Sequence, residues 1–165
     1  MERTLQVLNK LERDGVLRRY AISGSMGATF YIEPLLTFDL DIIVLLLETQ
    51  SELLTLAPLY EALRAKGYAE EGECVMIEGV PLPFLPAYNA LLDEALRDAR
   101  EMPYQATSTR VLRVEHLVAI CLQTGRAKDR ERVRILRDQA TLDSAYLSGI
   151  LHRHQLEGKW KEWTA

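Results

Sequence analysis

Two aspartates stand directly before the most apolar segment of the chain. Asp39 and Asp41 are separated by one residue, and an uninterrupted aliphatic run over residues 42–47 follows them. This run predicts a buried strand, and side chains two apart on a strand point to the same face. Two carboxylates at the mouth of a buried strand repel each other and lose hydration unless a cation compensates them. The pattern therefore predicts an oxygen-ligand site for Mg²⁺ or Mn²⁺, of the kind that also contacts substrate phosphates.

A small turn precedes this strand. Residues 16–22 predict an earlier strand, and Ser23, Gly24 and Ser25 follow it before a short helix expected over residues 26–31. Gly24 would let the backbone approach a phosphate, and Ser25 would offer a hydroxyl and a backbone N–H at the start of the helix. The same residues also fit an ordinary helix N-cap. The turn therefore predicts either a phosphate contact or a simple cap.

Length and composition indicate a single globular domain. The chain has 165 residues, of which 48% are apolar and 27% are charged, which is enough for one hydrophobic core. We expect one domain over residues 1–165, with a core at about 15–114 and C-terminal helices at about 115–155. Cys74 and Cys121 show no paired spacing, so they are expected to be reduced thiols of a cytoplasmic protein.

Charge and hydropathy argue against several classes of protein. No apolar segment is long enough to span a bilayer, and residues 1–17 lack the apolar centre of a signal peptide, so no membrane role is expected. The net charge of -4 argues against general coating of nucleic acid. Residues 126–137 are nevertheless basic, with six basic side chains against two acidic ones. This segment predicts either a solvated helix face or a surface that faces phosphate or RNA.

The order of the expected elements is typical of an α+β fold. Further helices are expected over residues 2–13, 52–66, 88–100, 115–123, 127–140 and 143–153, and further strands over 74–78, 80–85 and 108–114. Glu78 and Gly79 are expected to form the tight turn of a hairpin. Pro81 and Pro83 within its second strand and Pro86 directly after it predict an edge strand. The tail that carries Trp160 and Trp163 is expected to dock loosely or to fray.

Three segments in order give the chain a resemblance to a known family. With the Gly24-Ser25 turn, Asp39-x-Asp41 and residues 125–130 (Gly-Arg-Ala-Lys-Asp-Arg), the chain resembles the nucleotidyltransferase superfamily over about residues 15–140. It looks most like the small bacterial branch that includes toxin-side nucleotidyltransferases of type IV toxin–antitoxin systems. The resemblance implies a mixed β-sheet flanked by helices and a helical C-terminal part. It also implies that the turn holds nucleotide phosphates and that the two aspartates bind a divalent metal ion.

Two positions depart from the pattern of that superfamily. A third carboxylate is expected on a neighbouring strand as a metal ligand or base, and Pro83 occupies its place. Glu78 lies one hairpin back and is the candidate substitute, although it also fits a solvent-facing turn residue. Cys121 stands where the toxin-like relatives present a lysine to the nucleotide, and a buried cysteine usually serves packing alone.

The basic turn near the C-terminal helices supplies the remaining candidates. Arg126 and Lys128 could lie beside a triphosphate, while Asp129 begins the next helix as a favourable N-terminal anion. Alternatively, Arg126 and Asp129 pair with each other and brace the junction of two helices.

The sequence thus leads to two hypotheses about function. The first is a Mg²⁺- or Mn²⁺-dependent nucleotidyltransferase that moves a nucleoside monophosphate from a nucleoside triphosphate to an unidentified acceptor, which is an RNA, a protein or a small molecule. The second is a catalytically degenerate module of the same fold that binds nucleotide or a protein partner, as a toxin–antitoxin or adaptor component. The catalytic candidates are Asp39, Asp41 and Glu78, the metal ligands are Asp39 and Asp41, and the nucleotide-binding candidates are Gly24, Ser25, Arg126 and Lys128.

Overall fold

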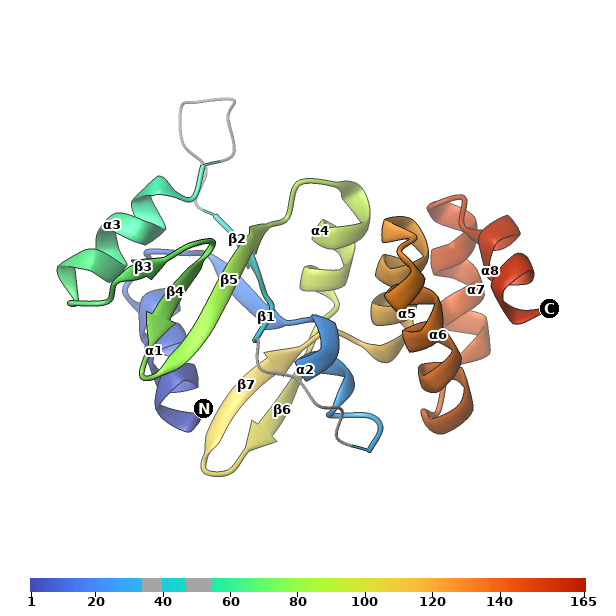
Figure 1. The fold of residues 1–165 in the computed structure, drawn as a ribbon, viewed down its shortest axis with the longest axis horizontal. Coiled ribbons are helices and arrows are strands. Elements are labelled where there is room, and N and C mark those ends of the chain that lie inside the picture. Colours follow the sequence, from blue (N-terminus) through green and yellow to red (C-terminus); the bar gives the residue numbers. More distant parts are fainter. Residues whose placement is uncertain (34–39, 47–54) are drawn as a thin grey trace.

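The computed structural model describes residues 1–33, 40–46 and 55–165, and it shows one mixed sheet with helices packed on both faces (Figure 1). The helices are α1 (Glu2–Arg13), α2 (Gly24–Ala28), α3 (Ala57–Ala65), α4 (Ala90–Arg97), α5 (Val114–Thr124), α6 (Ala127–Gln139), α7 (Ser144–Arg153) and α8 (Glu157–Thr164). The strands are β1 (Arg19–Ile22), β2 (Ile42–Leu45), β3 (Glu70–Glu71), β4 (Cys74–Ile77), β5 (Val80–Pro86), β6 (Arg100–Tyr104) and β7 (Thr107–Val111).

The strands of the described residues form one sheet in the order β3-β4-β5-β2-β1-β7-β6. β1 and β2 are antiparallel, whereas the pairs β2–β5 and β1–β7 are parallel. The C-terminal helices α5 to α8 gather beyond one end of this sheet (Figure 1). The predicted α+β class, with a mixed sheet and a helical C-terminal part, is therefore confirmed.

The register at the centre of the sheet brings the small turn and an aspartate together. Ile22 at the end of β1 lies opposite Ile42 at the start of β2. The turn that follows β1 and the residue that precedes β2 consequently lie at the same place, and the backbone N–H of Ser23 donates to the carbonyl oxygen of Asp41 at 2.9 Å. Two segments that are separate in the sequence therefore form one structural unit.

The aliphatic residues of β2 are buried on both faces of the sheet. Ile42 and Val44 pack in a core that includes α1 and α3, whereas Ile43 packs in a second core that includes α4 and α5. This alternation follows from the period of two residues along a strand. Burial on both faces explains why the sequence shows a continuous apolar run here rather than an alternating one.

β5 is an interior strand, so the prediction that it lies at a sheet edge was wrong. It pairs with β4 on one side and with β2 on the other. Residues two apart on a strand direct their N–H groups to the same side. Pro81 and Pro83 therefore remove donors toward one neighbour only, and Leu82 and Phe84 keep theirs toward the other.

The segment after α4 also differs from the prediction. The expected helix over residues 88–100 ends at Arg97, and Arg100–Tyr104 forms β6, which pairs with β7 in an antiparallel hairpin. β6 is an outer strand of the sheet and carries charged residues and Pro103, so it lacks the alternating apolar pattern that identifies a half-buried strand.

The C-terminal tail forms a helix instead of fraying. Trp160 and Trp163 of α8 pack against the core that contains α5 and α7. The Nζ atom of Lys159 lies 5.2 Å from the ring centroid of Trp163, which is a cation–π distance. The aromatic side chains thus attach a short, strongly charged helix that its sequence alone would not stabilise.

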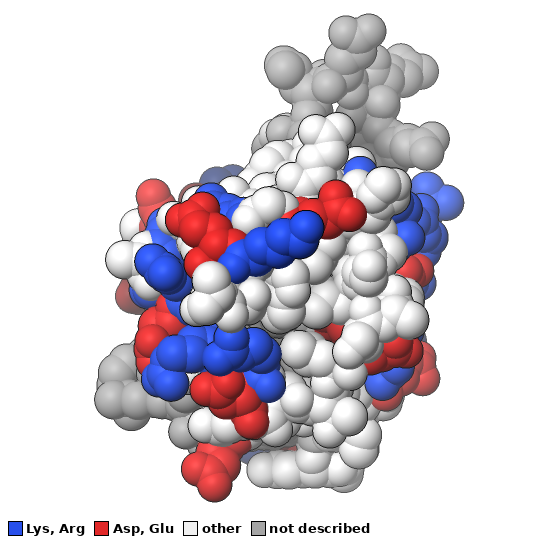
Figure 2. Space-filling view, turned by 90° about the vertical axis from the view of Figure 1, so that its right-hand side faces the viewer, with Lys and Arg blue, Asp and Glu red and all other residues white. Residues whose placement is uncertain are grey.

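The surface of the C-terminal helices carries both signs of charge. Figure 2 shows Lys and Arg side chains interspersed with Asp and Glu side chains over this face, without a continuous basic area. On α6, Arg134 pairs with Glu131, and Arg137 pairs with Asp138. The outer part of the basic segment is therefore a solvated helix face, as one of the two readings predicted. In the described part of the chain, no helix has the length and apolarity needed to cross a membrane.

Candidate functional site

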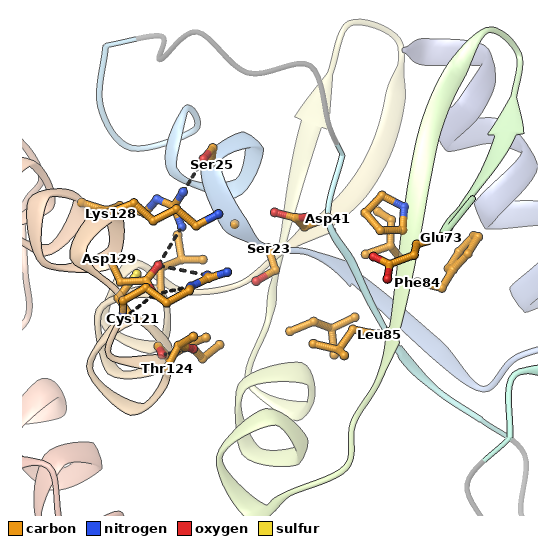
Figure 3. Close-up of a pocket in the computed structure, with 18 of the residues that line it drawn as sticks. Ser23, Ser25, Asp41, Glu73, Phe84, Leu85, Cys121, Thr124, Lys128 and Asp129 are labelled. Atoms are coloured by element: carbon orange, nitrogen blue, oxygen red, sulfur yellow. Dashed lines mark hydrogen bonds and ion pairs between the residues drawn. The ribbon is translucent and has the colours of Figure 1, made fainter. Parts of the chain in front are cut away.

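A pocket of about 740 Å³ lies where the turn after β1, the start of β2 and the junction of α5 and α6 meet (Figure 3). Five of the predicted site residues line it: Gly24, Ser25, Asp41, Arg126 and Lys128. Asp39 lies outside the described residues. The fold thus brings together the predicted turn, one strand aspartate and the basic segment from distant parts of the sequence.

Gly24 is required by the carboxylate of Asp41. Its φ is +59°, and a Cβ atom placed on it would lie 1.8 Å from Oδ2 and 2.7 Å from Cγ of Asp41. Residues other than glycine rarely adopt this φ, and no carboxylate can remain so close to a Cβ atom. The glycine therefore allows Asp41 to lie against the backbone of the turn while its carboxylate lines the pocket.

Ser25 connects the turn to α6. Its hydroxyl oxygen accepts a hydrogen bond of 2.6 Å from Nη2 of Arg132, 107 positions later in the sequence. Arg132 also lines the pocket, and its Nη1 atom lies 3.6 Å from Oδ1 of Asp129. The sequence reasoning did not include Arg132 among the site residues. Its spacing of four from Lys128 was the available signal, since residues four apart share one face of a helix.

Arg126 and Asp129 brace the start of α6, as the alternative interpretation of this segment predicted. Nε of Arg126 donates to Oδ2 of Asp129 at 2.7 Å, and Nη2 donates to Oδ1 at 3.1 Å. The carboxylate also accepts the backbone N–H of Arg126, so the acidic residue at the third position of α6 caps the start of the helix. The hydrogen bond to Asp129 raises the pKa of the Arg126 guanidinium, and the negative charge of Asp41 raises it further. Arg126 is therefore a structural residue that also lines the pocket.

The two sides of the pocket carry opposite charge. Lys128 and Asp129 lie on the side formed by α5 and α6, and they face Asp41 across the pocket (Figure 3). Three cationic side chains on this side, Arg126, Lys128 and Arg132, stand against one carboxylate that is 1% exposed, Asp129. This side has an excess of positive charge, which suits an anionic ligand.

The structure does not bring Glu78 to the pocket. Glu78 is exposed in the turn between β4 and β5 with a φ of +52°, and its Oε1 atom accepts a 2.8 Å hydrogen bond from the hydroxyl of Tyr68. Glu73, just before β4, lines the pocket instead. The register explains this exchange because Cys74 lies opposite Pro83, so the residue before Cys74 reaches the mouth of the pocket. Counting back along the predicted hairpin would have identified this residue.

The two departures from the superfamily pattern both lie in the pocket. Phe84 pairs with Ile42, so Pro83 lies beside Asp41 on the neighbouring strand and offers no carboxylate. Cys121 lies on α5 and is 4% exposed, and burial raises the pKa of its thiol to about 11. This thiol is therefore protonated and unreactive at neutral pH.

A second cluster of ionisable groups lies outside the pocket. Ligand atoms of Glu94, Asp98 and His116 all lie within 4.8 Å of one another. However, Glu94 already accepts hydrogen bonds from Arg153 at 2.7 Å and from His154 at 2.8 Å. Burial opposes ionisation of Glu94, but the bonds from Arg153, His154 and His116 outweigh it and lower its pKa to about 2. The guanidinium of Arg153 thus already supplies the positive charge that a metal ion would bring to this cluster.

Solved structures similar to this chain include a nucleotidyltransferase-like protein and an antibiotic-resistance factor. One is an antigenic nucleotidyltransferase-like protein from Paracoccidioides brasiliensis, with 14% identity and a TM-score of 0.55 over 98% of this chain and 91% of that one. The other is the antibiotic-resistance factor ANT(2'')-Ia, with 14% identity and a TM-score of 0.51 over 98% of this chain and 97% of that one.

These similarities show a nucleotidyltransferase-like fold. No protein-family model matches the sequence, and no curated protein matches it significantly. At 14% identity the structural neighbours establish the fold alone. The toxin–antitoxin branch therefore stays a prediction, and the activity has to be argued from the pocket.

Proposed function

We propose that the protein is a nucleotidyltransferase that moves a nucleoside monophosphate from a nucleoside triphosphate to an acceptor hydroxyl. The observation that carries this proposal is the meeting of a carboxylate, a glycine-serine turn and a cationic helix start in one pocket of a nucleotidyltransferase-like fold. Chemically, the acceptor oxygen forms a bond to the α-phosphorus, the bond from that phosphorus to the bridging oxygen of the β-phosphate breaks, and pyrophosphate leaves.

The cationic side of the pocket suits the triphosphate. Lys128 is exposed at the first turn of α6, and Arg126 at the same helix start has its charge only partly compensated by Asp129. Ser25 offers its hydroxyl from the opposite turn. These side chains can hold phosphate oxygens by charge-assisted hydrogen bonds, which are stronger than neutral ones.

Asp41 suits a divalent cation. It presents hard oxygen ligands beside the phosphate-binding turn, which is the donor chemistry of Mg²⁺ and Mn²⁺. Asp39, two positions earlier, is the predicted second ligand. The cation would neutralise charge on the triphosphate and the leaving group. The close approach of Asp41 to the backbone of Gly24 places this carboxylate beside the turn.

Glu73 is the carboxylate that could accept the proton of the acceptor. It directly precedes Cys74, the β4 residue that lies opposite Pro83, and among the described residues it forms no ion pair. The other carboxylates that line the pocket have different roles, because Asp41 is the proposed metal ligand and Asp129 is held by two arginines. A proton transferred to Glu73 leaves the acceptor oxygen free to attack.

The acceptor is left as an RNA, a protein or a small molecule. Leu85 and Tyr88, which are 42% and 60% exposed, line the outer part of the pocket and offer an apolar surface for its binding. The test is incubation of the pure protein with α-labelled nucleoside triphosphate, Mg²⁺ and separated RNA, protein and small-molecule fractions of a lysate. Transfer of label to one fraction supports the proposal and identifies the acceptor class, and absence of label in all three contradicts it.

The presence of Pro83 favours one alternative function. A protein without the carboxylate expected beside Asp41 could bind a nucleotide and a protein partner without transferring anything, as a toxin–antitoxin or adaptor component. Binding of ATP and Mg²⁺ without pyrophosphate release in the presence of every acceptor fraction would support this alternative.

A further inference from the structure

We propose that Arg132 is a phosphate-binding residue of the pocket, which supplies a planar guanidinium to the triphosphate of the bound nucleotide. This inference rests on the proposed function and deepens it, because it assigns a ligand contact to a residue that the sequence motifs do not include. It is carried by the environment of Arg132 in the folded protein.

The first observation is a largely buried cation with unused hydrogen-bond donors. The side chain of Arg132 is 17% exposed, whereas that of Arg134 on the same helix is 58% exposed. A guanidinium has five N–H groups. Among the described residues, the hydroxyl of Ser25 is the one oxygen within hydrogen-bond distance of this guanidinium. The guanidinium also hydrogen-bonds to the thiol of Cys121, which acts to lower the pKa of that thiol. With five N–H groups, it keeps donors toward the pocket that these two contacts do not use.

The second observation is incomplete compensation of charge. Asp129 forms hydrogen-bonded contacts with Arg126, and its distance of 3.6 Å to Arg132 is that of an ion pair without a close hydrogen bond. One buried carboxylate thus serves two guanidiniums. Burying a cation without full pairing is unfavourable, so an anionic ligand that enters the pocket gains binding energy at this position.

The third observation is that the guanidinium of Arg132 points toward the glycine-serine turn. Nη2 of Arg132 reaches Ser25 at 2.6 Å, and Ser25 belongs to the turn that packs against Asp41. Lys128 lies one helical turn before Arg132, and both line the pocket. A phosphate beside Ser25 would consequently lie within reach of a planar guanidinium that can bind two oxygens at once. Orthophosphate alone offers the same chemistry, so the test compares it with nucleotides.

The test is a calorimetric titration of ATP with Mg²⁺ into the wild type and into Arg132→Gln. Glutamine retains most of the aliphatic stem and a polar amide group, so the variant removes the guanidinium and its charge with a limited change of shape. We expect Arg132→Gln to weaken ATP binding roughly tenfold to a hundredfold, as for loss of a charged hydrogen bond, and to weaken AMP and orthophosphate binding less than ATP binding. Arg130→Gln is the matched control because Arg130 is exposed on α6 and does not line the pocket.

Three outcomes separate the possible errors. Wild-type affinity in Arg132→Gln, in a protein with unchanged melting temperature, would overturn the assignment and leave the proposed function intact. An equal loss in Arg130→Gln would show a general charge effect and would also overturn it. Absence of any nucleotide binding by the wild type would overturn the proposed function, and this assignment with it. If Arg132→Gln does not fold, Arg132→Lys provides the same comparison, with weaker binding expected because lysine cannot bind two oxygens in one plane.

Discussion

The two sides of the pocket differ in how their charged groups are held. On the side of α5 and α6, Asp129 is buried between Arg126 and Arg132, and the side chains are ordered by hydrogen bonds. On the side of the sheet, Asp41 rests against Gly24, a proline occupies the next strand, and Glu73 is an exposed residue just before β4. Charged side chains on the α5 and α6 side, which suits phosphate binding, are thus fixed by hydrogen bonds and ion pairs. The sheet side, which would carry out the transfer, lacks the third carboxylate that its fold predicts.

This difference makes binding and transfer separable properties of the molecule. Substitution of the cationic residues on the helix side should reduce nucleotide affinity. Substitution of the carboxylates on the sheet side should reduce the rate of transfer from a bound nucleotide. Gly24 is the point at which the two sides meet, because it contacts Asp41 and adjoins Ser25.

The largest effect is expected at Gly24, where both sides should fail together. In Gly24→Ala, the new Cβ atom would overlap the carboxylate of Asp41, and the φ of +59° would add a strain of about 1–2 kcal/mol. We expect loss of measurable ATP binding and of transfer. Gly79→Ala is the control, since Gly79 has a φ of +77° with no atom within 4 Å of its Cβ position. Equal behaviour of the two variants would show that the contact with Asp41 has no functional role.

Glu73→Gln should affect transfer without affecting binding. We expect a loss of about 10² in rate, the size associated with a positioned base, while the dissociation constant for ATP stays that of the wild type. Steady-state rates and calorimetry on the same samples measure both quantities. Glu78→Gln, in the exposed turn of the same hairpin, should keep the wild-type rate. Should Glu78→Gln be the slower variant, Glu73 would lose its assigned role.

Glu94 provides a comparison with a carboxylate whose role is structural. Its pKa is lowered to about 2 from an ordinary value of 4.5, so its stabilising contribution is present above about 4.5 and is lost as the pH falls toward 2. Glu94→Gln should therefore unfold at lower denaturant concentration than the wild type at pH 7, with a difference that shrinks through this range. Glu131→Gln, which removes a fully exposed carboxylate on α6, is the control and should change stability little. A difference that is independent of pH would contradict the structural role.

The smallest effect is a shift of the melting temperature by metal. A cation that binds only the folded protein stabilises it by mass action, so millimolar Mn²⁺ should raise the wild-type melting temperature by a few degrees. Asp41→Asn should lose most of this gain. Its metal-free form should be as stable as the wild type, because relief of the predicted repulsion between Asp41 and Asp39 offsets the lost attraction to Arg126. If Mn²⁺ does not change the melting temperature of the wild type and Asp41→Asn melts at a clearly lower temperature, Asp41 is a structural cap.

Much of the fold follows from local patterns in the sequence. The leucine stripe of α1 and the turn after it predict the helix at its observed bounds of Glu2–Arg13, and the aliphatic run after Asp41 predicts β2. The missed element β6 has charged residues and Pro103 at the outside of the sheet, where burial imposes no alternation. α8 is stabilised by Trp160 and Trp163, which pack against a core formed by helices distant in the sequence. The local sequence pattern carries no information about that contact.

The site was predictable where its residues belong to short motifs. Gly24, Ser25 and Asp41 stand in such motifs, and Arg126 and Lys128 lie together at one helix start. Glu73 and Arg132 depend on strand register and on the direction in which α6 packs. The spacing of four places Arg132 on the same helix face as Lys128, but the burial that distinguishes Arg132 from an exposed neighbour such as Arg134 comes from packing.

The most direct test of the account measures nucleotide bound and pyrophosphate released by the same sample. The wild type and Asp41→Asn are each incubated with ATP, Mg²⁺ and the acceptor fraction that takes up label. The account predicts binding by both proteins, pyrophosphate release by the wild type, and release by Asp41→Asn that is reduced to background. Equal release by the two proteins, or binding by the wild type with no release in any acceptor fraction, would contradict the claim that this pocket transfers nucleotides.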